Sequence, residues 1–255
     1  LRTRARRGGC ILRAVPQIVA QRTGCISALL HDVLNIKNAG NATMKHFHPR
    51  KGDHGQPVEL NAPSQPTAPS SWDDPNEIAT VTPDGPCPLT LNGIAFADWI
   101  DAPTTAAGWE GQVALTAATF TEPPMTTATG KAPASGVVIF EADGRVWVVS
   151  PSNGFGGYVN TIPKGKLDSG FTLRANALKE GYEECGLRVA LTGFLCDSLR
   201  STSVTRYYTA KRIGGHPARM CWETQAVHLA PRAELAKFIS HKNDQVIVQA
   251  LQALN

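Results

Sequence analysis

The chain has 255 residues, of which 42% are hydrophobic, so it is long enough to bury a core of its own. No apolar run approaches the ~18 residues that a helix needs to cross a bilayer, which argues against a membrane protein. The net charge of +4 hides an asymmetry, because residues 1–50 hold nine of the 25 Lys and Arg but one of the 21 acids. The remainder is mildly acidic, so the basic composition does not indicate nucleic acid as the partner.

Six cysteines are spread along the chain, and no two of them form a C-x-x-C pair. Disulfide-rich scaffolds are much shorter than this chain, and zinc sites cluster their ligands in sequence. The spacing therefore favours packed, reduced thiols in a cytoplasmic protein over a metal-binding or redox role.

The first half of the chain predicts little regular structure. Residues 1–43 are rich in Arg and poor in acids, as in a transit peptide or a basic arm, although the protein proper could also start at Met44. Residues 44–86 are rich in Pro, Ser, Asp and Gly and predict an irregular linker. Residues 87–130 predict a small ordered extension, with a short helix at 104–118, that packs on the main domain.

Residues 131–255 predict the main domain. Two β-rich runs surround Ala142-Asp143-Gly144, which is a hairpin signal. A helix is expected at 172–185, between a threonine suited to the N-cap and a glycine suited to a left-handed C-terminal position. Further strands are expected at 187–199, 202–215 and 223–231, and further helices at 231–241 and 243–254, the last capped by Asn243 or Asp244. This order predicts an α/β fold (an α+β sandwich) with a mixed sheet packed between helices.

The predicted helix at 172–185 carries three acidic residues on one face. Glu180, Glu183 and Glu184 follow one another at i, i+3 and i+4, and at ~100° per residue they lie within one turn. Like charges at this spacing repel by roughly 0.2–0.5 kcal/mol, and acids in the last turn oppose the helix dipole. A divalent cation would remove the conflict, because Mg²⁺ prefers carboxylate and phosphate oxygens. A solvated acidic face is the plainer alternative.

The surrounding sequence resembles the Nudix box. That pattern is Gly, five residues, Glu, seven residues, Arg-Glu, an apolar residue, any residue, Glu-Glu, any residue, Gly and an apolar residue. The positions that agree in this chain are Gly165, Glu180, Glu183, Glu184, Gly186 and Leu187. The resemblance covers about residues 134–255, and it implies the Nudix fold and metal chemistry without specifying the substrate.

Three positions of the box depart from the family pattern. Phe171 replaces the first Glu, Lys179 replaces the Arg, and Gly181 replaces the apolar residue. The first Glu and the Arg support each other in the family, so their joint loss predicts a coupled replacement in which Phe171 packs instead. Glycine inside a helix costs about 1 kcal/mol relative to Ala, so Gly181 predicts a close approach of the helix backbone to the sheet.

The resemblance also implies a mechanism. Mg²⁺ or Mn²⁺ would be bound by Glu180, Glu183 and Glu184, together with the carbonyl group of Gly165. Water would then attack phosphorus and displace the other phosphate group. Glu223, just before a predicted strand, is a candidate for a further carboxylate that acts as a ligand or base. The catalytic candidates are therefore Glu183, Glu184 and Glu223, although a glutamate at the edge of a strand is often just solvated.

Candidates for substrate binding lie in the loop that opens the box and on a predicted strand. Lys164 and Lys166 would hold phosphate, unless they are ordinary loop lysines. Arg206 would contact phosphate, and either Tyr208 or Tyr158 would stack on a base, although such residues are more often structural.

The leading hypothesis is metal-dependent hydrolysis of a pyrophosphate bond in a nucleoside diphosphate-linked or dinucleoside polyphosphate-like substrate. The start Pro163-Lys164-Gly165-Lys166 resembles that of Nudix members acting on dinucleoside polyphosphates or diphosphoinositol polyphosphates, and ADP-ribose and NAD-like substrates stay open. The alternative is a catalytically weak Nudix module that binds nucleotides as a sensor. Nucleic-acid binding would depend on residues 1–43 alone, and a homodimer through the 87–130 extension is a further hypothesis.

Overall fold

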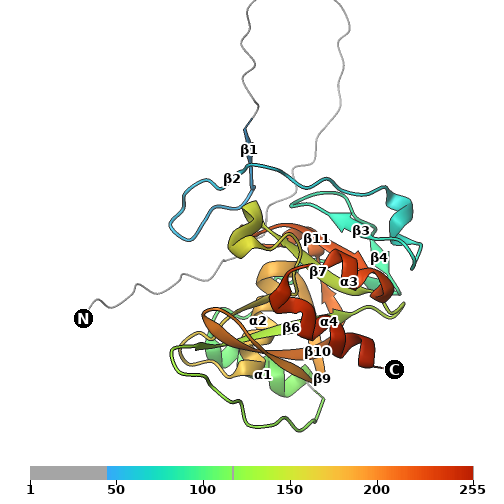
Figure 1. Cartoon of the computed structure of the whole chain (residues 1–255). Coiled ribbons are helices and arrows are strands. Elements are labelled where there is room, and N and C mark those ends of the chain that lie inside the picture. Colours follow the sequence, from blue (N-terminus) through green and yellow to red (C-terminus); the bar gives the residue numbers. More distant parts are fainter. Residues whose placement is uncertain (1–44, 117, 255) are drawn as a thin grey trace, which may run out of the picture.

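The structure is a computed structural model that describes residues 45–116 and 118–254 (Figure 1). The predictions for residues 1–43 lie outside this range. The strands are β1 (His46–Phe47), β2 (Glu59–Leu60), β3 (Ala79–Val81), β4 (Thr90–Leu91), β5 (Ile94–Ala95), β6 (Ala132–Phe140), β7 (Val146–Pro151), β8 (Lys164–Lys166), β9 (Leu187–Leu199), β10 (Ser203–Gly215) and β11 (Thr224–Ala230). The α-helices are α1 (Ala106–Thr116), α2 (Leu173–Cys185), α3 (Leu235–Phe238) and α4 (Gln245–Ala253). The 3-10 turns are η1 (Pro69–Trp72), η2 (Ser152–Gly157), η3 (Pro217–Arg219), η4 (Arg232–Glu234) and η5 (Lys242–Asp244).

A seven-stranded mixed sheet forms the centre of the molecule. Its strand order is β3-β11-β7-β6-β10-β9, with β8 paired to one end of β6. Strands β6 and β10 run parallel, while β9 is antiparallel to β10. The predicted hairpin at 142–144 is confirmed, because β6 and β7 pair antiparallel with Ile139 opposite Trp147.

Both faces of the sheet are buried, and its central strands β6 and β7 are apolar at most positions. Val137 and Ile139 pack into the core on the side of α2, whereas Val138 between them belongs to the core beneath α3 and α4. The predicted fold class, a mixed sheet packed between helices, is confirmed (Figure 1). No helix in the described part of the chain is long and apolar enough to cross a membrane.

Helix α2 begins and ends where the sequence predicts. The Thr172 hydroxyl accepts a hydrogen bond from the Ala175 N–H at 3.2 Å, and Gly186 adopts the left-handed conformation with φ of 68°. A methyl group added at Gly181 would lie 2.9 Å from Val137 Cγ1 on β6, which confirms the predicted close approach to the sheet. The helix backbone can therefore lie directly on the centre of the sheet.

Residues of the 87–130 segment pack against α2. Its helix α1 presents Trp109 to Tyr182 of α2, with ring centroids 5.9 Å apart. Trp99 meets the same tyrosine edge-on at 5.2 Å and also contacts Trp109. These aromatic contacts cover the outer side of α2 and hold it on the sheet.

Residues 45–86 are largely irregular, but they are anchored to the sheet. Strand β3 pairs antiparallel with β11 and so forms one edge of the sheet. Trp72 is 2% exposed and packs against Phe96 and Trp147 at centroid distances of 5.9 Å and 6.1 Å. This segment therefore contributes to the main hydrophobic core. The predicted domain borders stay a prediction.

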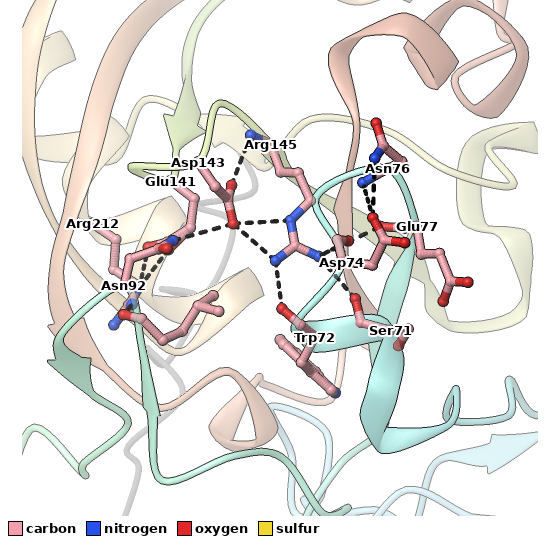
Figure 2. Close-up of polar contacts among 11 residues, drawn as sticks. Ser71, Trp72, Asp74, Asn76, Glu77, Asn92, Glu141, Asp143, Arg145 and Arg212 are labelled. Carbon is pink, nitrogen blue, oxygen red and sulfur yellow. Dashed lines mark hydrogen bonds and ion pairs between the residues drawn. The ribbon is translucent and has the colours of Figure 1, made fainter.

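A buried guanidinium group holds this segment in place (Figure 2). Arg145, at the start of β7, donates to the carbonyl oxygens of Ser71 at 2.9 Å, Trp72 at 2.7 Å and Asp74 at 3.1 Å. Its charge is balanced by Asp143, whose carboxylate lies 2.8 Å from Nη2. Arg145 is 1% exposed, and these carbonyl and carboxylate oxygens satisfy the hydrogen bonds of its buried guanidinium group.

A second buried arginine anchors the β4–β5 hairpin in the same way. Arg212 on β10 donates to both carboxylate oxygens of Glu141, at 2.7 Å and 3.1 Å, and to the Leu91 carbonyl oxygen at 2.8 Å (Figure 2). Burial raises the pKa of Glu141, and Arg212 opposes that rise. Two buried arginines, one directly before β7 and one on β10, thus hold segments that precede these strands in sequence.

The C-terminal helices differ from the prediction. The segment at 231–241 contains only one turn of α-helix, α3, preceded by η4. Asp244 precedes α4 as predicted, but its side chain makes no capping hydrogen bond. Its carboxylate instead accepts from the Thr161 hydroxyl at 2.7 Å and from Arg200. The prediction of a side-chain cap is wrong because these tertiary partners take both carboxylate oxygens.

The cysteines follow the prediction in part. Cys87, Cys185 and Cys196 are free thiols, and burial raises the pKa of Cys87 and of Cys196 to about 11. Cys221 is disulfide-bonded, so the prediction of reduced cysteines fails at that residue.

Candidate active site

The first acidic residue of α2 lies directly against β8. Glu180 is 6% exposed, and a methyl group added at Gly165 would lie 2.2 Å from its carboxylate carbon. Any side chain at position 165 would displace this carboxylate, so glycine is required here for space. The helix and the strand that opens the box are therefore fitted to each other at this point.

The next two acidic residues each accept a hydrogen bond from a lysine, one from its backbone and one from its side chain. The Glu184 carboxylate accepts from the backbone N–H of Lys164 at 3.0 Å, which links α2 to β8. The Glu183 carboxylate accepts from Lys179 Nζ at 2.5 Å, one turn earlier in the helix. Both side chains are half-buried.

The fourth acidic residue reaches this helix from another part of the chain. Glu223 is exposed and lies in the loop that leads into β11. That loop is fastened to α2, because the Cys221 N–H donates to the Glu183 carbonyl oxygen at 2.7 Å. The negative charge of Glu223 raises the pKa values of Glu180, Glu183 and Glu184. The structure therefore brings together the four glutamates that the sequence singled out.

These carboxylates are in an environment that disfavours their ionised form. Burial is the largest cause, and it raises the pKa of Glu184 to about 8 and that of Glu180 well above its usual range. Glu183 shifts in the same direction, with Lys179 opposing the effect of burial. Lys179 itself is desolvated, but Glu180 and Glu183 raise its pKa. One lysine thus offsets only part of the negative charge.

The donor set suits a hard divalent cation, because it consists of carboxylate oxygens that lack sufficient counter-charge. It is not assembled in advance: within residues 45–116 and 118–254, no three His, Cys, Asp or Glu side chains form a group that could hold a metal ion. The Glu183 carboxylate faces Lys179, and the Glu184 carboxylate faces β8. A cation would therefore have to draw these side chains away from their present partners.

The structure shows which residues take the places of the first Glu and the Arg of the box. Lys179 Nζ lies 3.2 Å from the carboxylate of Asp168, a residue of the loop between β8 and α2. Phe171 packs against the hydrophobic core, as predicted for the coupled replacement. Asp168 thus gives Lys179 an acidic partner three residues before the position where the family pattern has glutamate. The sequence reasoning missed it, although the Asp followed by Ser-Gly was a visible signal.

A second residue that the sequence reasoning missed is Asn176, which is fully buried on α2. Its amide group donates to the Ser135 hydroxyl at 3.0 Å and to the Gly165 carbonyl oxygen at 3.4 Å. Its side-chain oxygen accepts from the Asp168 N–H at 3.3 Å. Asn176 therefore ties α2, β6 and the box loop together. The signal was a polar residue within an otherwise apolar helix face.

The two lysines that open the box are placed differently. Lys164 Nζ lies 3.1 Å from the Thr161 hydroxyl and 4.7 Å from the centre of the Tyr158 ring, and burial lowers its pKa. Lys166 is exposed at the end of β8. The Tyr158 hydroxyl accepts from Arg200 at 2.7 Å, so this tyrosine is held beside Lys164.

Arg206 and Tyr208 are engaged elsewhere. Arg206 is 2% exposed, and its guanidinium group pairs with Asp197 at 2.8 Å and with Glu122 at 3.0 Å. The Tyr208 hydroxyl donates to the same Glu122 at 2.7 Å. Both side chains are therefore held by acidic residues other than the proposed metal ligands on α2, and their role in substrate binding stays a prediction.

A mixed sheet between helices, with acidic residues gathered on α2 and in the loop that leads into β11, agrees with the Nudix-type pyrophosphohydrolase that the sequence predicts. Comparison with known families agrees, because the family model described as NUDIX domain matches residues 130–251. The chain therefore carries a NUDIX domain over these residues. No curated protein sequence matches the chain significantly.

Many solved structures match the chain, and the three described next do so at low identity. A NUDIX hydrolase from Nitrosomonas europaea is 16% identical, with a TM-score of 0.42, over 50% of this chain and 73% of that one. An Ap4A hydrolase from C. elegans is 18% identical, with a TM-score of 0.39, over 47% and 92% of the two chains. An ADP-ribose pyrophosphatase from Streptococcus suis is 17% identical, with a TM-score of 0.35, over 49% and 94%. Similarity at this level does not extend to the substrate.

Proposed function

We propose that this chain hydrolyses the pyrophosphate bond of a nucleoside diphosphate-linked or dinucleoside polyphosphate-like substrate, with Mg²⁺ or Mn²⁺ as cofactor. The observation that carries the proposal is the convergence of Glu180, Glu183, Glu184 and Glu223 from two separate segments of the chain. Burying several acids together is costly unless a cation neutralises them, so a purely structural role does not account for the cluster.

The cation would be held by the carboxylates of Glu180, Glu183 and Glu184 together with the carbonyl oxygen of Gly165, a residue whose α-carbon faces the Glu180 carboxylate. When bound, it would neutralise charge on the pyrophosphate group and activate a water molecule. Asn176 and Lys179 would position these ligands, because one contacts Gly165 and the other contacts Glu183.

Glu223 is the candidate for the general base, because it is the most exposed of the four glutamates. An attacking water molecule would give its proton to the Glu223 carboxylate while its oxygen bonds to phosphorus. The bond from that phosphorus to the bridging oxygen breaks, and the second phosphate group leaves with the bridging oxygen.

Substrate binding is assigned to the basic residues beside the cluster. Lys164 and Lys166 flank Gly165 on β8. The charge of Lys164 interacts with Glu184 and Glu180, and both lysines would attract the outer phosphate groups. Tyr158 lies against Lys164 and offers a ring for stacking on a base. Arg206 would contact phosphate and Tyr208 would stack on a base. Residues 87–130 would form the contact of a homodimer.

The test is a hydrolysis assay on the full chain. The panel would contain dinucleoside polyphosphates, ADP-ribose and NAD, each with Mg²⁺ or Mn²⁺, and phosphate would be measured after coupling to a phosphatase. We expect cleavage that depends on the metal and is lost in the Glu183→Gln, Glu184→Gln double variant. Glu234→Gln serves as the control, because Glu234 forms only an exposed pair with Lys237.

The competing hypothesis is a nucleotide-binding sensor without turnover. Its support is the ion pair between Lys179 and Glu183, which occupies one of the proposed metal ligands. Tight binding of a nucleotide from the panel, without cleavage under any metal condition, would establish the sensor and reject the enzyme.

A further inference from the structure

Residues 45–62, here called the β1–β2 hairpin, lie outside the matched Nudix domain but beside its proposed active site. Strands β1 and β2 pair antiparallel and are joined by a turn in which the Gly52 N–H donates to the Gln56 carbonyl oxygen at 2.9 Å. In Figure 1 the hairpin, in blue, lies next to the turn η2 and the start of β11. Arg50 of the hairpin pairs with Asp84, and other hairpin residues contact two loops that also contact each other.

The first contact is with the loop that carries Glu223. The Trp222 indole N–H donates to the Asp53 carboxylate at 3.0 Å. His48 is 4% exposed, and its Nδ1 accepts from the Arg50 N–H at 3.0 Å. Its Nε2 therefore carries the proton in the neutral ring and donates to the Thr224 carbonyl oxygen, 3.0 Å away. The hairpin thus holds the residues on both sides of Glu223.

The second contact is with the turn η2. The Asn153 side chain accepts from the Asn61 N–H and donates to the Glu59 carbonyl oxygen, both at 2.8 Å. Asn153 has a left-handed φ of 56°, a conformation that asparagine tolerates better than most residues. This reciprocal pair fixes the turn to β2.

The two loops close a ring of hydrogen bonds. The Ser152 N–H donates to the Glu223 carbonyl oxygen at 2.8 Å, and the Ser152 hydroxyl donates to the Trp222 carbonyl oxygen at 2.7 Å. The Cys221 N–H reaches the Glu183 carbonyl oxygen on α2. The backbone around Glu223 is therefore held from three directions, by α2, by η2 and by the hairpin.

We propose that the β1–β2 hairpin is a positioning element of the active site, which holds Glu223 over the carboxylates of α2 through Asp53 and His48. The inference rests on the proposed function, because it takes Glu223 as a reacting group. Asp53 and His48 act through the backbone and the neighbouring indole of the Glu223 loop and do not contact the reacting atoms. These bonds hold the Trp222 indole and the Thr224 carbonyl group, on either side of Glu223, and the positioning of a reacting group contributes strongly to catalysis.

The test removes one hydrogen bond from either side in the full chain. Asp53→Ala changes an exposed residue, so the fold is retained, and Trp222→Phe removes the same bond from the loop. Loss of a hydrogen bond that supports a reacting group from outside lowers activity by about 10- to 100-fold. We therefore expect kcat to fall about tenfold with little change in KM. Lys45→Ala is the matched control, because it breaks only the exposed pair with Glu59 of the same hairpin.

A double-variant cycle identifies the route of the effect. In a Glu223→Gln background, Asp53→Ala should cause no further fall in kcat, because the group that it positions is already gone. A full additional tenfold fall would overturn the proposal, as would an Asp53→Ala variant that behaves like Lys45→Ala.

Amide hydrogen exchange gives a readout that does not need turnover. Asp53→Ala and Trp222→Phe should increase exchange at residues 221–224, whereas Lys45→Ala should not. If the unaltered chain cleaves no substrate, the proposed function fails, but an increase confined to these residues would still establish that the hairpin holds the loop. Unchanged exchange in both variants would overturn the inference independently of the assay.

Discussion

The molecule buries two groups of charges, and they are built in opposite ways. Around Arg145 and Arg212, positive and negative groups are matched and further satisfied by backbone carbonyl oxygens (Figure 2). Around α2, four acidic residues lie near two lysines, one of which turns its ammonium group toward Thr161. The first group is saturated with partners, and the second has an excess of one sign.

The difference separates structure from function in physical terms. A saturated group gains its stability from partners that are already present, so it needs nothing further and serves to fix the segments that it joins. A group with excess charge lowers the stability of the fold and persists because something else completes it. The two groups should therefore respond with opposite sign when one member is neutralised.

The largest effect is expected at Arg145. Arg145→Ala would leave the carbonyl oxygens of Ser71, Trp72 and Asp74 without this donor and Asp143 without its partner. Removing one side of a buried pair costs about 3–5 kcal/mol, so the free energy of unfolding should fall by that amount. Urea denaturation followed by tryptophan fluorescence measures it, and Trp72 lies within the affected region.

Arg219→Ala is the control for this prediction. Arg219 also pairs with two acids, Asp84 and Asp98, but its side chain is 34% exposed. Exposed pairs contribute about 0–1 kcal/mol, so this variant should unfold almost like the unaltered chain. Equal losses in the two variants would show that saturation of the buried group is not what stabilises the segment.

The opposite sign is expected at Glu184. Burial raises its pKa to about 8, above the unfolded value, so its ionisation lowers stability as the pH rises from about 4.5 to about 8. Glu184→Gln keeps the hydrogen bond from the Lys164 N–H and should raise the free energy of unfolding at pH 8 by about 1 kcal/mol or more. The same variant should lose about 100-fold or more in hydrolysis, because it loses a charged metal ligand.

Both readouts are needed for Glu184→Gln. If both the stability and the activity fall, this carboxylate is a structural group, like the partners of Arg145. Unchanged activity would remove it from the proposed metal site.

Much of the fold could be predicted, because its signals are local. The caps of α2 and the turn at 142–144 depend on a few neighbouring residues and were found where expected. The C-terminal cap could not be predicted in this way. Asp244 has the right residue type and position, but Thr161 and Arg200, which are distant in sequence, take its carboxylate.

The site divides along the same line. Glu180, Glu183 and Glu184 follow from helical spacing, and Glu223 was proposed from the family resemblance. Asp168 and Asn176 were missed, because their roles appear only when the box loop folds back on α2. The hairpin contact of Asp53 with Trp222 joins residues 169 positions apart, and no periodicity in the sequence indicates it.

A smaller effect is expected at His228, a buried group without any charged partner. Its ring nitrogens lie 2.8 Å from the hydroxyl groups of Thr80 and Ser150, and burial lowers its pKa to about 4. The unfolded chain binds this proton more tightly, with a pKa near 6.5. Stability should therefore be complete above about pH 6.5 and fall by up to about 3 kcal/mol as the pH falls to about 4.

Unfolding measured between pH 7 and pH 4 checks this, with the difference between the unaltered chain and His228→Gln as the quantity of interest. That difference should shrink steadily as the pH falls. His46→Gln is the control, because His46 is exposed, and its difference from the unaltered chain should stay constant. A constant difference for His228→Gln would mean that the hydroxyl partners accommodate the charged ring.

The smallest effect is expected at Asp168, an acidic residue that pairs with Lys179 but is not one of the proposed metal ligands. Lys179 is shared among Asp168, Glu180 and Glu183, so the acid that lies outside the proposed ligand set draws the lysine partly away from the ligands. Asp168→Ala would leave the lysine to Glu180 and Glu183 alone, where it competes with the cation for the same oxygens. The affinity for Mn²⁺ should therefore fall, by about tenfold for a contact outside the ligand set.

Titration with Mn²⁺ followed by electron paramagnetic resonance measures this affinity without turnover, and Asp168→Glu should recover most of it by restoring the acidic partner. Stability should change little, because the Asp168 side chain is 39% exposed. A loss of stability with unchanged Mn²⁺ affinity would instead place the pair of Asp168 and Lys179 with Arg145, as a structural clamp that holds the box loop. In that case the pairing of Lys179 with Asp168 would have no part in setting the affinity of the α2 carboxylates for the cation.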